Sequence, residues 1–307
     1  MITVKNVTKK FEDFTALKDM SCTIPKGCIY GLVGSNGAGK STFLRVITGV
    51  YRPESGAVYI DNMPVYENPA VKQRFTYVPD ELYFLPQASL QRMSRLYAAN
   101  YAGFDFARYN QLTKLFQLNP TAPLNTFSKG MRRQAATILA LSCKPDYIFF
   151  DETFDGLDPV MRNLVKKIVY DDVYDRQATA VITSHSLREL EDTCDQLALL
   201  HKGGMIFESE IGNLKTSLFK LQVVVNEEYD ARAFSNLGIE VKSFKKTGSV
   251  YTLIMQGDRA DVSKRMRMLN PVFMEILPLT LEEVFLHEME ALGYAFPEYF
   301  RETEDAE

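Results

Sequence analysis

The segment Gly34-Ser35-Asn36-Gly37-Ala38-Gly39-Lys40-Ser41, followed by Thr42, sets the expectation for the fold of the whole chain. It matches the pattern G-x-x-x-x-G-K-[S/T], in which a glycine-rich loop joins a strand to a helix. An apolar run at 28–33 precedes it and a helical pattern at 40–50 follows it, so the required context is present. In this setting successive backbone N–H groups face phosphate oxygens, and the helix N-terminus adds partial positive charge.

Two side chains of this loop have chemistry of their own. Lys40 is a mobile point charge that can reach between the β- and γ-phosphates of a nucleotide, and the Ser41 hydroxyl can hold Mg²⁺. A glycine-rich loop that binds nothing is the alternative, and the strand, lysine and hydroxyl together argue against it. The residues expected at the nucleotide are Gly34, Ser35, Asn36, Gly37, Ala38, Gly39, Lys40, Ser41 and Thr42.

A second acidic element is Tyr147-Ile-Phe-Phe-Asp151-Glu152. An apolar strand that ends in two carboxylates delivers both of them to the carboxyl edge of a parallel sheet, beside the phosphate loop. There Asp151 would contact Mg²⁺, and Glu152 would orient and polarise the attacking water as a catalytic residue. Alone, such a pair could simply cap the following turn. Its place well after a phosphate loop favours the catalytic interpretation.

Composition limits the class of protein. The 307 residues include 35 lysines and arginines and 39 aspartates and glutamates, giving a net charge of −4. This acidic balance argues against a protein held mainly by nucleic-acid phosphates. The longest mostly apolar runs, 135–143 and 146–150, fall far short of the about 18 residues of a membrane span. The N-terminus has no signal-peptide pattern. We expect the four scattered cysteines to be reduced and buried.

The pattern along the chain predicts two domains. Up to about residue 211, short apolar runs alternate with helical patterns, which is typical of βαβ units and a mainly parallel sheet. The runs 2–7 and 16–24 predict an antiparallel strand pair, and 90–118 has helical periodicity. We therefore expect an α/β domain over residues 1–213, with N-terminal antiparallel strands and a helical subdomain at about 82–135.

After this point the expected order becomes β-α-β-β-α-β, which is ferredoxin-like. We predict a small α+β domain over residues 214–307. Its expected strands are 219–225, 239–244, 250–255 and 272–276, and its expected helices are 231–237, 259–269 and 281–292.

Further motifs follow the phosphate loop in order. Phe127-Ser-Lys-Gly-Met131, with Arg132 and Arg133 after it, is similar to the signature LSGGQ, and Gly156-Leu-Asp-Pro159 is similar to a D-loop. His185 follows an expected strand. Over about residues 1–214, this set resembles the ATP-binding subunit of an ABC transporter, within the single-domain bacterial ATPases that serve exporters. The resemblance implies a P-loop NTPase cassette of the ABC type.

By position, the resemblance implies a role for each motif, with ATP and Mg²⁺ as cofactors. Phe11 would stack on adenine, Asp158 would belong to the D-loop, and His185 would be the catalytic switch histidine. Ser128 and Gly130 would face the γ-phosphate bound to a second subunit. Two ATP molecules would then be buried between head-to-tail cassettes.

Simpler alternatives stay open for three of these residues. Ser128 could only cap a helix. His185 could be an ordinary surface or capping histidine. Phe11 could belong to the core of the N-terminal sheet, and Phe14 is close enough in sequence that either ring could meet the base.

Some positions depart from the family pattern. Asp80 stands where a glutamine that meets Mg²⁺ is usual, and its carboxylate could bind Mg²⁺ while adding negative charge near the phosphates. Lys129 and Met131 replace the usual glycine and glutamine of the signature, and Thr153 replaces the common proline after Glu152. Because Glu152 is present, we predict an active ATPase.

The resemblance also implies partners. A membrane permease subunit on a separate chain would dock on the region 90–103, where Tyr97 and Tyr101 form a groove or pack internally. The second cassette could be a copy of this chain or a related one. No nucleic-acid partner is expected, and the protein would be cytoplasmic, peripheral on the inner face of the membrane. The alternatives are a soluble ATPase acting on DNA or ribosomes and a regulatory nucleotide-binding module.

Overall fold

A computed structural model describes residues 1–154, 156–212, 218–225, 229, 239, 241–277, 279–280 and 282–284. The chain divides into two compact units, Met1–Ser209 and Glu210–Glu307. The boundary expected between residues 213 and 214 falls on segment 213–217, which lies outside the described residues.

A six-stranded sheet forms the centre of the first unit. Its strands are β3 (Ile29–Val33), β6 (Phe75–Val78), β7 (Tyr147–Asp151), β8 (Thr179–Ser184), β9 (Gln196–His201) and β10 (Gly204–Glu210). They lie in the order β10-β9-β3-β8-β7-β6, and the five strands from β9 to β6 are parallel. Every residue of β3, β7 and β8 is buried, as expected for strands covered on both faces. Their carboxyl ends therefore meet at one edge, the edge at which ligands bind in α/β folds.

An antiparallel sheet lies beside the central one. It consists of β1 (Ile2–Phe11), β2 (Phe14–Ile24), β4 (Ser55–Ile60) and β5 (Met63–Pro64), in the order β2-β1-β4-β5. The register places Phe11 directly opposite Phe14, so residues 12–13 form the turn between β1 and β2. Apolar side chains of this sheet, of α1 (Lys40–Ile47) and of β3 form one core, which includes Ile2, Leu17, Tyr30 and Phe43.

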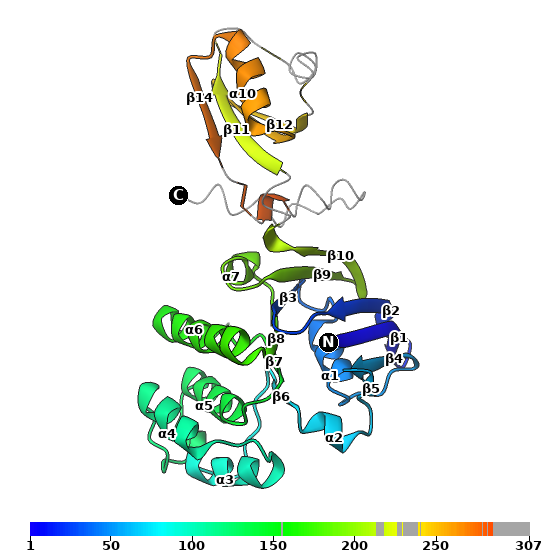
Figure 1. Cartoon of the computed structure of the whole chain (residues 1–307), viewed down its shortest axis with the longest axis vertical. Helices are drawn as coiled ribbons and strands as arrows, with labels where there is room; N and C mark the ends of the chain where they lie inside the picture. The colour runs from blue at the N-terminus through cyan, green and yellow to red at the C-terminus, as the bar shows by residue number, and fades with distance from the viewer. Residues whose placement is uncertain are drawn as a thin grey trace. The chain divides into compact units, whose positions relative to one another are not determined.

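On the other side of the central strands, α5 (Lys129–Ser142) and α6 (Pro159–Arg176) lie against the sheet, and α3 (Leu90–Asn100) and α4 (Phe106–Leu115) pack against α5 (Figure 1). Each of these helices has an N-cap residue whose side chain accepts a hydrogen bond from a backbone N–H group of the first turn. These N–H groups have no partner within the helix, so the cap satisfies them. These capping residues are Ser89, Asp105, Ser128 and Asp158. The shorter helices are α2 (Pro69–Lys72), η1 (Leu124–Thr126) and α7 (Leu187–Glu191).

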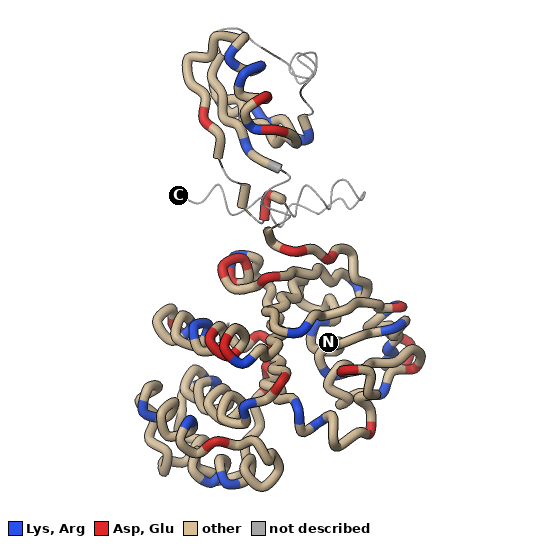
Figure 2. Tube along the Cα trace, viewed as in Figure 1, with Lys and Arg blue, Asp and Glu red and all other residues tan. Residues whose placement is uncertain are grey.

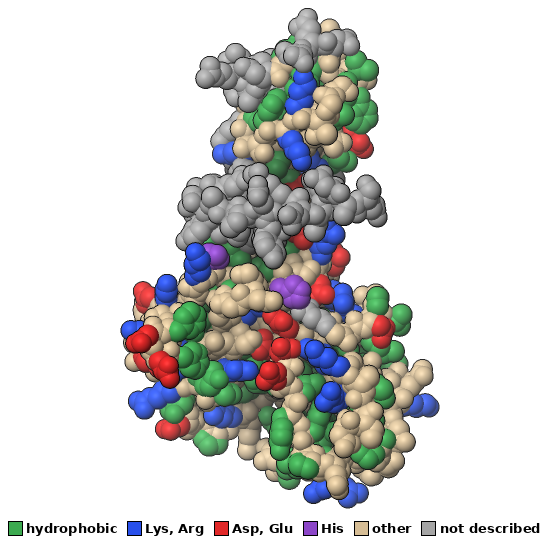
Figure 3. All heavy atoms as spheres, turned by 180° about the vertical axis from the view of Figure 1, so that it is seen from behind, with side chains coloured by type: hydrophobic (Ala, Val, Ile, Leu, Met, Phe, Trp, Pro, Cys, Tyr) green, Lys and Arg blue, Asp and Glu red, His purple; other side chains and the backbone are tan. Residues whose placement is uncertain are grey.

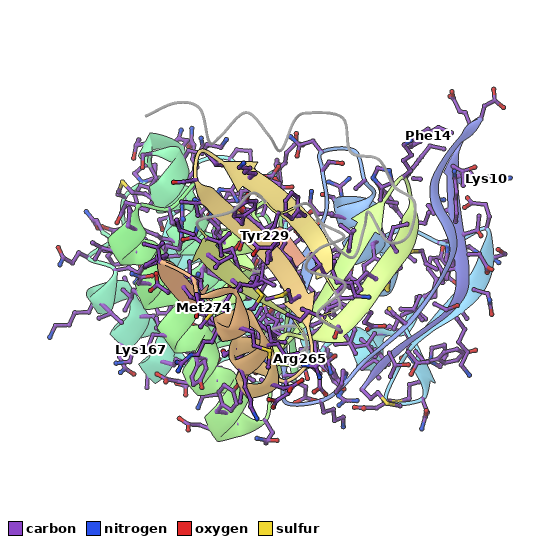
Figure 4. The ribbon with its side chains drawn as sticks, turned by 90° about the horizontal axis from the view of Figure 1, so that it is seen from above. Lys10, Phe14, Lys167, Tyr229, Arg265 and Met274 are labelled. Carbon is purple, nitrogen blue, oxygen red and sulfur yellow. The ribbon has the colours of Figure 1, made fainter. Side chains whose placement is uncertain are left out.

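The second unit contains a four-stranded antiparallel sheet. Its strands are β11 (Leu218–Val224), β12 (Val241–Thr247), β13 (Val250–Gln256) and β14 (Phe273–Leu277), in the order β12-β13-β11-β14. The helix α10 (Arg259–Met266), followed by η2 (Arg267–Leu269), packs its Val262 and Met266 against the apolar face of this sheet. Figure 4 labels Tyr229, Arg265 and Met274 of this unit.

The predicted elements agree with the structure in several places. The central sheet is parallel between β9 and β6, and β1 and β2 form the expected antiparallel pair. The helical pattern at 90–118 is two helices, because the chain leaves α3 at Tyr101 and Asp105 caps α4. In the second unit, the expected helix 231–237 and most of 281–292 lie outside the described residues, so the ferredoxin-like order stays a prediction.

All four cysteines are buried and none forms a disulfide, as expected. Burial raises the pKa of Cys22, Cys28 and Cys143 to about 12 and also raises that of Cys194.

Positions of basic and acidic residues are interspersed along the trace of the first unit, as Figure 2 shows. Within the described part of the chain, no helix combines the length and apolar character that a bilayer crossing requires.

Candidate functional site

The phosphate loop follows β3 and leads directly into α1, as the sequence predicts. Gly39, the residue before the helix, has φ 109, a conformation that side chains with a Cβ rarely adopt. No side chain caps the first N–H groups of α1, so they stay available to an anion. A Cβ on Gly34 would lie 2.4 Å from the carbonyl oxygen of Leu200, so only glycine fits there.

Lys40 is held inside the loop. Its side chain is 4% exposed, and its ammonium donates to the carbonyl of Gly34 at 2.7 Å and to that of Ser35 at 3.3 Å. The same group lies 3.1 Å from Oε1 of Glu152. The Lys40 ammonium therefore lies inside the curled loop, next to a carboxylate from the segment that follows β7.

Asp151 ends β7 and is fully buried. Its Oδ1 accepts hydrogen bonds from the hydroxyls of Ser41 at 3.0 Å and Thr183 at 2.9 Å, and its Oδ2 accepts one from Tyr77 at 3.1 Å. Burial raises the pKa of Asp151, while these three donors act in the opposite direction.

The chemistry of this pair fits Mg²⁺. The Ser41 hydroxyl and the Asp151 carboxylate are hard oxygen donors, and Mg²⁺ is usually held by one or two carboxylates together with substrate phosphates. Among the described residues no cluster of three or more histidine, cysteine or acidic side chains could hold a metal by itself. Ser41 and Asp151 have the donor chemistry to hold a Mg²⁺ ion that is also bound by nucleotide phosphates.

Glu152 has an unusual backbone. Its φ is 46, in the left-handed region, which costs free energy for a residue other than glycine and must be held by its surroundings. Its N–H donates to the hydroxyl of Thr183 at 3.0 Å, and its carbonyl accepts from Nη1 of Arg133 at 2.6 Å. Hydrogen bonds thus hold both the N–H and the carbonyl group of Glu152 in place.

A pocket of about 450 Å³ brings Lys40, Ser41 and Glu152 together. Its lining combines the loop and the start of α1 with the carboxylates of Asp80 and Glu152 and one aromatic ring: Phe14, Ala16, Asn36, Gly37, Gly39, Lys40, Ser41, Thr42, Asp80 and Glu152. Asp151 is not part of the lining and lies behind Ser41, to which it is hydrogen-bonded. Figure 3 shows acidic side chains next to basic ones on one face of the first unit.

Asp80 lies at the wall of this pocket and in an ion pair. Its Oδ1 is 2.5 Å from Nη2 of Arg133, which is 3% exposed and comes from α5. The sequence singled out Asp80 as a substitute metal ligand, and the structure adds this partner.

The two aromatic rings considered for the nucleotide base differ in their placement. Phe14 is 64% exposed and lines the pocket, and Figure 4 shows it at the end of the β1–β2 hairpin. Phe11 is not among the lining residues; its ring contacts that of Tyr51 edge-on at 5.3 Å. Because Phe11 and Phe14 are cross-strand partners, their side chains lie on the same face of the hairpin.

The remaining predicted residues lie outside this pocket. Ser128 is exposed and caps α5 by accepting from the N–H of Met131 at 3.2 Å, and Asp158 caps α6. A Cβ on Gly130 would lie 3.1 Å from the carbonyl of Gly156, which brings the signature and D-loop segments into contact. His185 is exposed and follows β8.

Sequence reasoning missed Tyr77 and Thr183 and gave Arg133 no role. Tyr77 lies near the end of β6 and Thr183 near the end of β8, at the edge to which β7 delivers Asp151. Polar residues near the carboxyl ends of neighbouring parallel strands are a usable signal. The position of Arg133 in the sequence does not indicate its contacts with Asp80 and Glu152.

The chain is similar to ATP-binding proteins of ABC transporters. A family model described as ABC transporter matches residues 17–155. ABC transporter ATP-binding protein YtrB of Bacillus subtilis is 29% identical over 93% of this chain and 97% of its own. ABC transporter ATP-binding protein NatA of the same organism is 33% identical over 71% of this chain and 92% of the NatA chain. Daunorubicin/doxorubicin resistance ATP-binding protein DrrA of Streptomyces peucetius is 30% identical over 71% of this chain and 67% of the DrrA chain.

Solved structures give the same class. An ATP-binding subunit of an ABC transporter has a TM-score of 0.65 and 26% identity, over 70% of this chain and 92% of that one. Fold and site define an ATP-binding cassette of the P-loop type. The chain belongs to the ABC transporter family, as an ATP-hydrolysing subunit that powers transport.

Proposed function

We propose that two cassettes close head-to-tail on two MgATP and that hydrolysis reopens them. The observation that carries this is the meeting of Lys40, Ser41 and Glu152 at one pocket, with Asp151 buried behind it and hydrogen-bonded to Ser41. The loop N–H groups and Lys40 bind the phosphates, and Ser41 and Asp151 would hold a Mg²⁺ ion, whose positive charge would offset that of the phosphates. Glu152 orients the attacking water and accepts its proton.

Residues outside the pocket act across the cassette interface in this proposal. Ser128 and Gly130, at the N-terminus of α5, face the γ-phosphate bound to the partner cassette, where the helix end adds positive charge. The exposure of Ser128 and its absence from the pocket lining support this assignment. Asp158 and His185 belong to the same interface. The adenine stacks on the aromatic face made by Phe11 and Phe14.

The partner that couples turnover to transport is a membrane permease on a separate chain. A groove of about 440 Å³ fits its cytoplasmic helix, since both α2 and α3 line it: Pro69, Lys72, Gln73, Leu96, Tyr97, Asn100 and Tyr101. Tyr97 and Tyr101 stack at 5.8 Å and are half-buried, so they form the wall of this groove. The chain would then act at the inner face of the membrane, as a cytoplasmic, peripheral subunit.

Export is the proposed direction of transport, in line with the resemblance to exporter ATPases and with a relative whose name assigns it to drug resistance. The proposed domains are a cassette over residues 1–213, with a helical subdomain at about 82–135, and an accessory domain over 214–307.

The test is steady-state ATP hydrolysis by the full-length chain, together with co-purification from membranes. We expect Mg²⁺-dependent phosphate release and capture of a polytopic membrane protein, reduced by Tyr97→Ala with Tyr101→Ala. Hydrolysis without capture would refute the permease partner. Capture without hydrolysis would point to the regulatory alternative.

A further inference from the structure

The guanidinium of Arg133 joins three segments of the first unit. Arg133 belongs to α5, its Nη1 donates to the carbonyl of Glu152 at 2.6 Å, and its Nη2 lies 2.5 Å from Oδ1 of Asp80. The helix that begins at the signature is thereby connected to the segment after β6 and to the segment after β7.

The contact with Glu152 has a geometric consequence. A residue at φ 46 stays there only when its neighbours fix it, and the Arg133 bond fixes the carbonyl side while Thr183 fixes the amide side. The direction of the Glu152 side chain follows from this backbone. Loss of the Arg133 bond lets the backbone relax and moves the carboxylate.

The contact with Asp80 has an electrostatic consequence. A guanidinium that is 3% exposed needs a carboxylate partner, because an unpaired buried charge is strongly unfavourable. Asp80 supplies that partner, and it also lines the phosphate pocket. An aspartate here therefore has a function apart from any metal.

Gly156 leaves room for this arrangement. A Cβ on Gly156 would lie 2.9 Å from Nε and 3.2 Å from Cδ of Arg133, too close for both atoms to stay in place. The D-loop segment thus borders the side chain that holds Glu152.

We propose that Arg133 is a positioning residue for hydrolysis, which holds the Glu152 backbone in place and is itself held by Asp80. This inference rests on the role proposed above for Glu152. It assigns Asp80 to Arg133 and not to Mg²⁺.

The experiment compares Arg133→Gln, Asp80→Asn, their combination, Gly156→Ala and Glu152→Gln in the full-length chain. We measure kcat, KM for ATP, the Mg²⁺ concentration at half-maximal rate and the thermal midpoint. A small displacement at a reacting group costs on the order of 100-fold. We therefore expect kcat about 10- to 100-fold lower for Arg133→Gln, with KM for ATP and the Mg²⁺ requirement within twofold of the parent.

The double variant of Arg133→Gln and Asp80→Asn shows whether the two residues affect kcat together or independently. If Asp80 acts through Arg133, adding Asp80→Asn to Arg133→Gln lowers kcat no further, because residues that act as a unit are non-additive. Gly156→Ala should lower kcat with the same unchanged KM. Arg108→Gln is the matched control: it breaks a partly buried ion pair with Asp172 (2.6 Å) away from the pocket, so only the thermal midpoint should fall.

Three results would overturn the proposal. The first is parental kcat in Arg133→Gln while Glu152→Gln is inactive, which leaves the proposed function intact. The second is a raised Mg²⁺ requirement in Asp80→Asn alone, which makes Asp80 a metal ligand. If Arg133→Gln does not fold, parental kcat in both Asp80→Asn and Gly156→Ala overturns it. An active Glu152→Gln refutes instead the function on which the proposal rests.

Discussion

The ammonium group of Lys40 lies 3.1 Å from a carboxylate oxygen of Glu152, so an ion pair joins the phosphate loop to the segment after β7. The Lys40 side chain is 4% exposed and that of Glu152 is 21% exposed. The phosphates of ATP and this carboxylate would compete for the same cation. Nucleotide binding therefore exchanges one partner of Lys40 for another, and releases Glu152 toward the water it is proposed to orient.

Glu152→Gln should separate binding from turnover. The amide cannot accept a proton or pair with Lys40, so we expect turnover to fall on the order of 100-fold or more. ATP should bind with equal or higher affinity, because the cation loses its competitor. Phosphate release and equilibrium nucleotide binding measure the two effects.

The control for Glu152→Gln is Glu283→Gln. This variant removes a similar ion pair in the second unit, in which Lys220 lies 2.7 Å from Glu283. We expect parental binding and turnover from this variant. A Glu152→Gln protein that hydrolyses ATP at the parental rate would remove Glu152 from the proposed mechanism.

Asp151→Asn should slow hydrolysis strongly without loss of stability. Burial raises the pKa of Asp151, so its contribution to stability is present below the ordinary pKa of 3.8 and is lost as pH rises through the raised value. At neutral pH the buried charge is unfavourable, and a neutral amide of the same shape relieves it. We expect a thermal midpoint at pH 7, without nucleotide, equal to or above that of the parent.

The same variant should show hydrolysis lower by on the order of 100-fold at saturating Mg²⁺, because a ligand of the metal is gone. Scanning calorimetry and phosphate release give both quantities. A midpoint well below the parent at pH 7, or parental turnover, would contradict the role of this carboxylate.

Asp61 should stabilise the first unit in a pH-dependent way. Burial alone would raise its pKa, but hydrogen bonds from Met1, Lys26, Arg74 and Tyr147 outweigh burial and hold the pKa well below its usual range. The stability it contributes is therefore present above pH 3.8 and is lost as pH falls toward the depressed value. Asp61→Asn should lower the free energy of unfolding at pH 7 by about 1–2 kcal/mol.

Denaturant unfolding between pH 7 and pH 3 measures this effect. The difference between parent and Asp61→Asn should shrink on acidification, whereas the exposed Asp175→Asn should change little at any pH. A difference that grows as the pH falls would show that the sign is wrong.

Gly39→Ala should weaken ATP binding by distorting the loop. Alanine rarely adopts φ 109, and its Cβ would lie 2.7 Å from the carbonyl oxygen of Ala16, so the loop must shift. We expect a loss of about 1–3 kcal/mol in stability together with weaker nucleotide binding. Gly248→Ala is the control for strain alone, since φ there is 60 and its Cβ would meet no atom within 4 Å. ATP affinity unchanged in Gly39→Ala would show that the loop tolerates a Cβ.

The sequence predicted the parts of the site whose chemistry demands a fixed spacing. Phosphate binding requires glycines, lysine and hydroxyl at set intervals, so the motif from Gly34 to Thr42 could be proposed as the phosphate site directly. The strand that ends in Asp151 was recognisable because a buried parallel strand is a short continuous apolar run. The structure places Lys40, Ser41 and Glu152 at one pocket, as their positions suggested.

What the sequence could not reveal are contacts between segments far apart in the chain. Arg133 and Asp80 are separated by 53 residues, and no local pattern pairs them. The hairpin register that sets Phe11 against Phe14 depends on a turn at 12–13. The break between α3 and α4 was signalled by Gly103 and by the capping residue Asp105, but helical periodicity on both sides hid it.

The four buried cysteines have a practical consequence for following the motion of this ATPase. With their pKa raised by burial, none of these thiols is ionised at neutral pH, and only the thiolate reacts readily with labelling reagents. Val160→Cys, at a position that is 70% exposed in the first turn of α6, would supply a single reactive group. A fluorophore placed there could report the approach of two cassettes in real time, in the otherwise native chain.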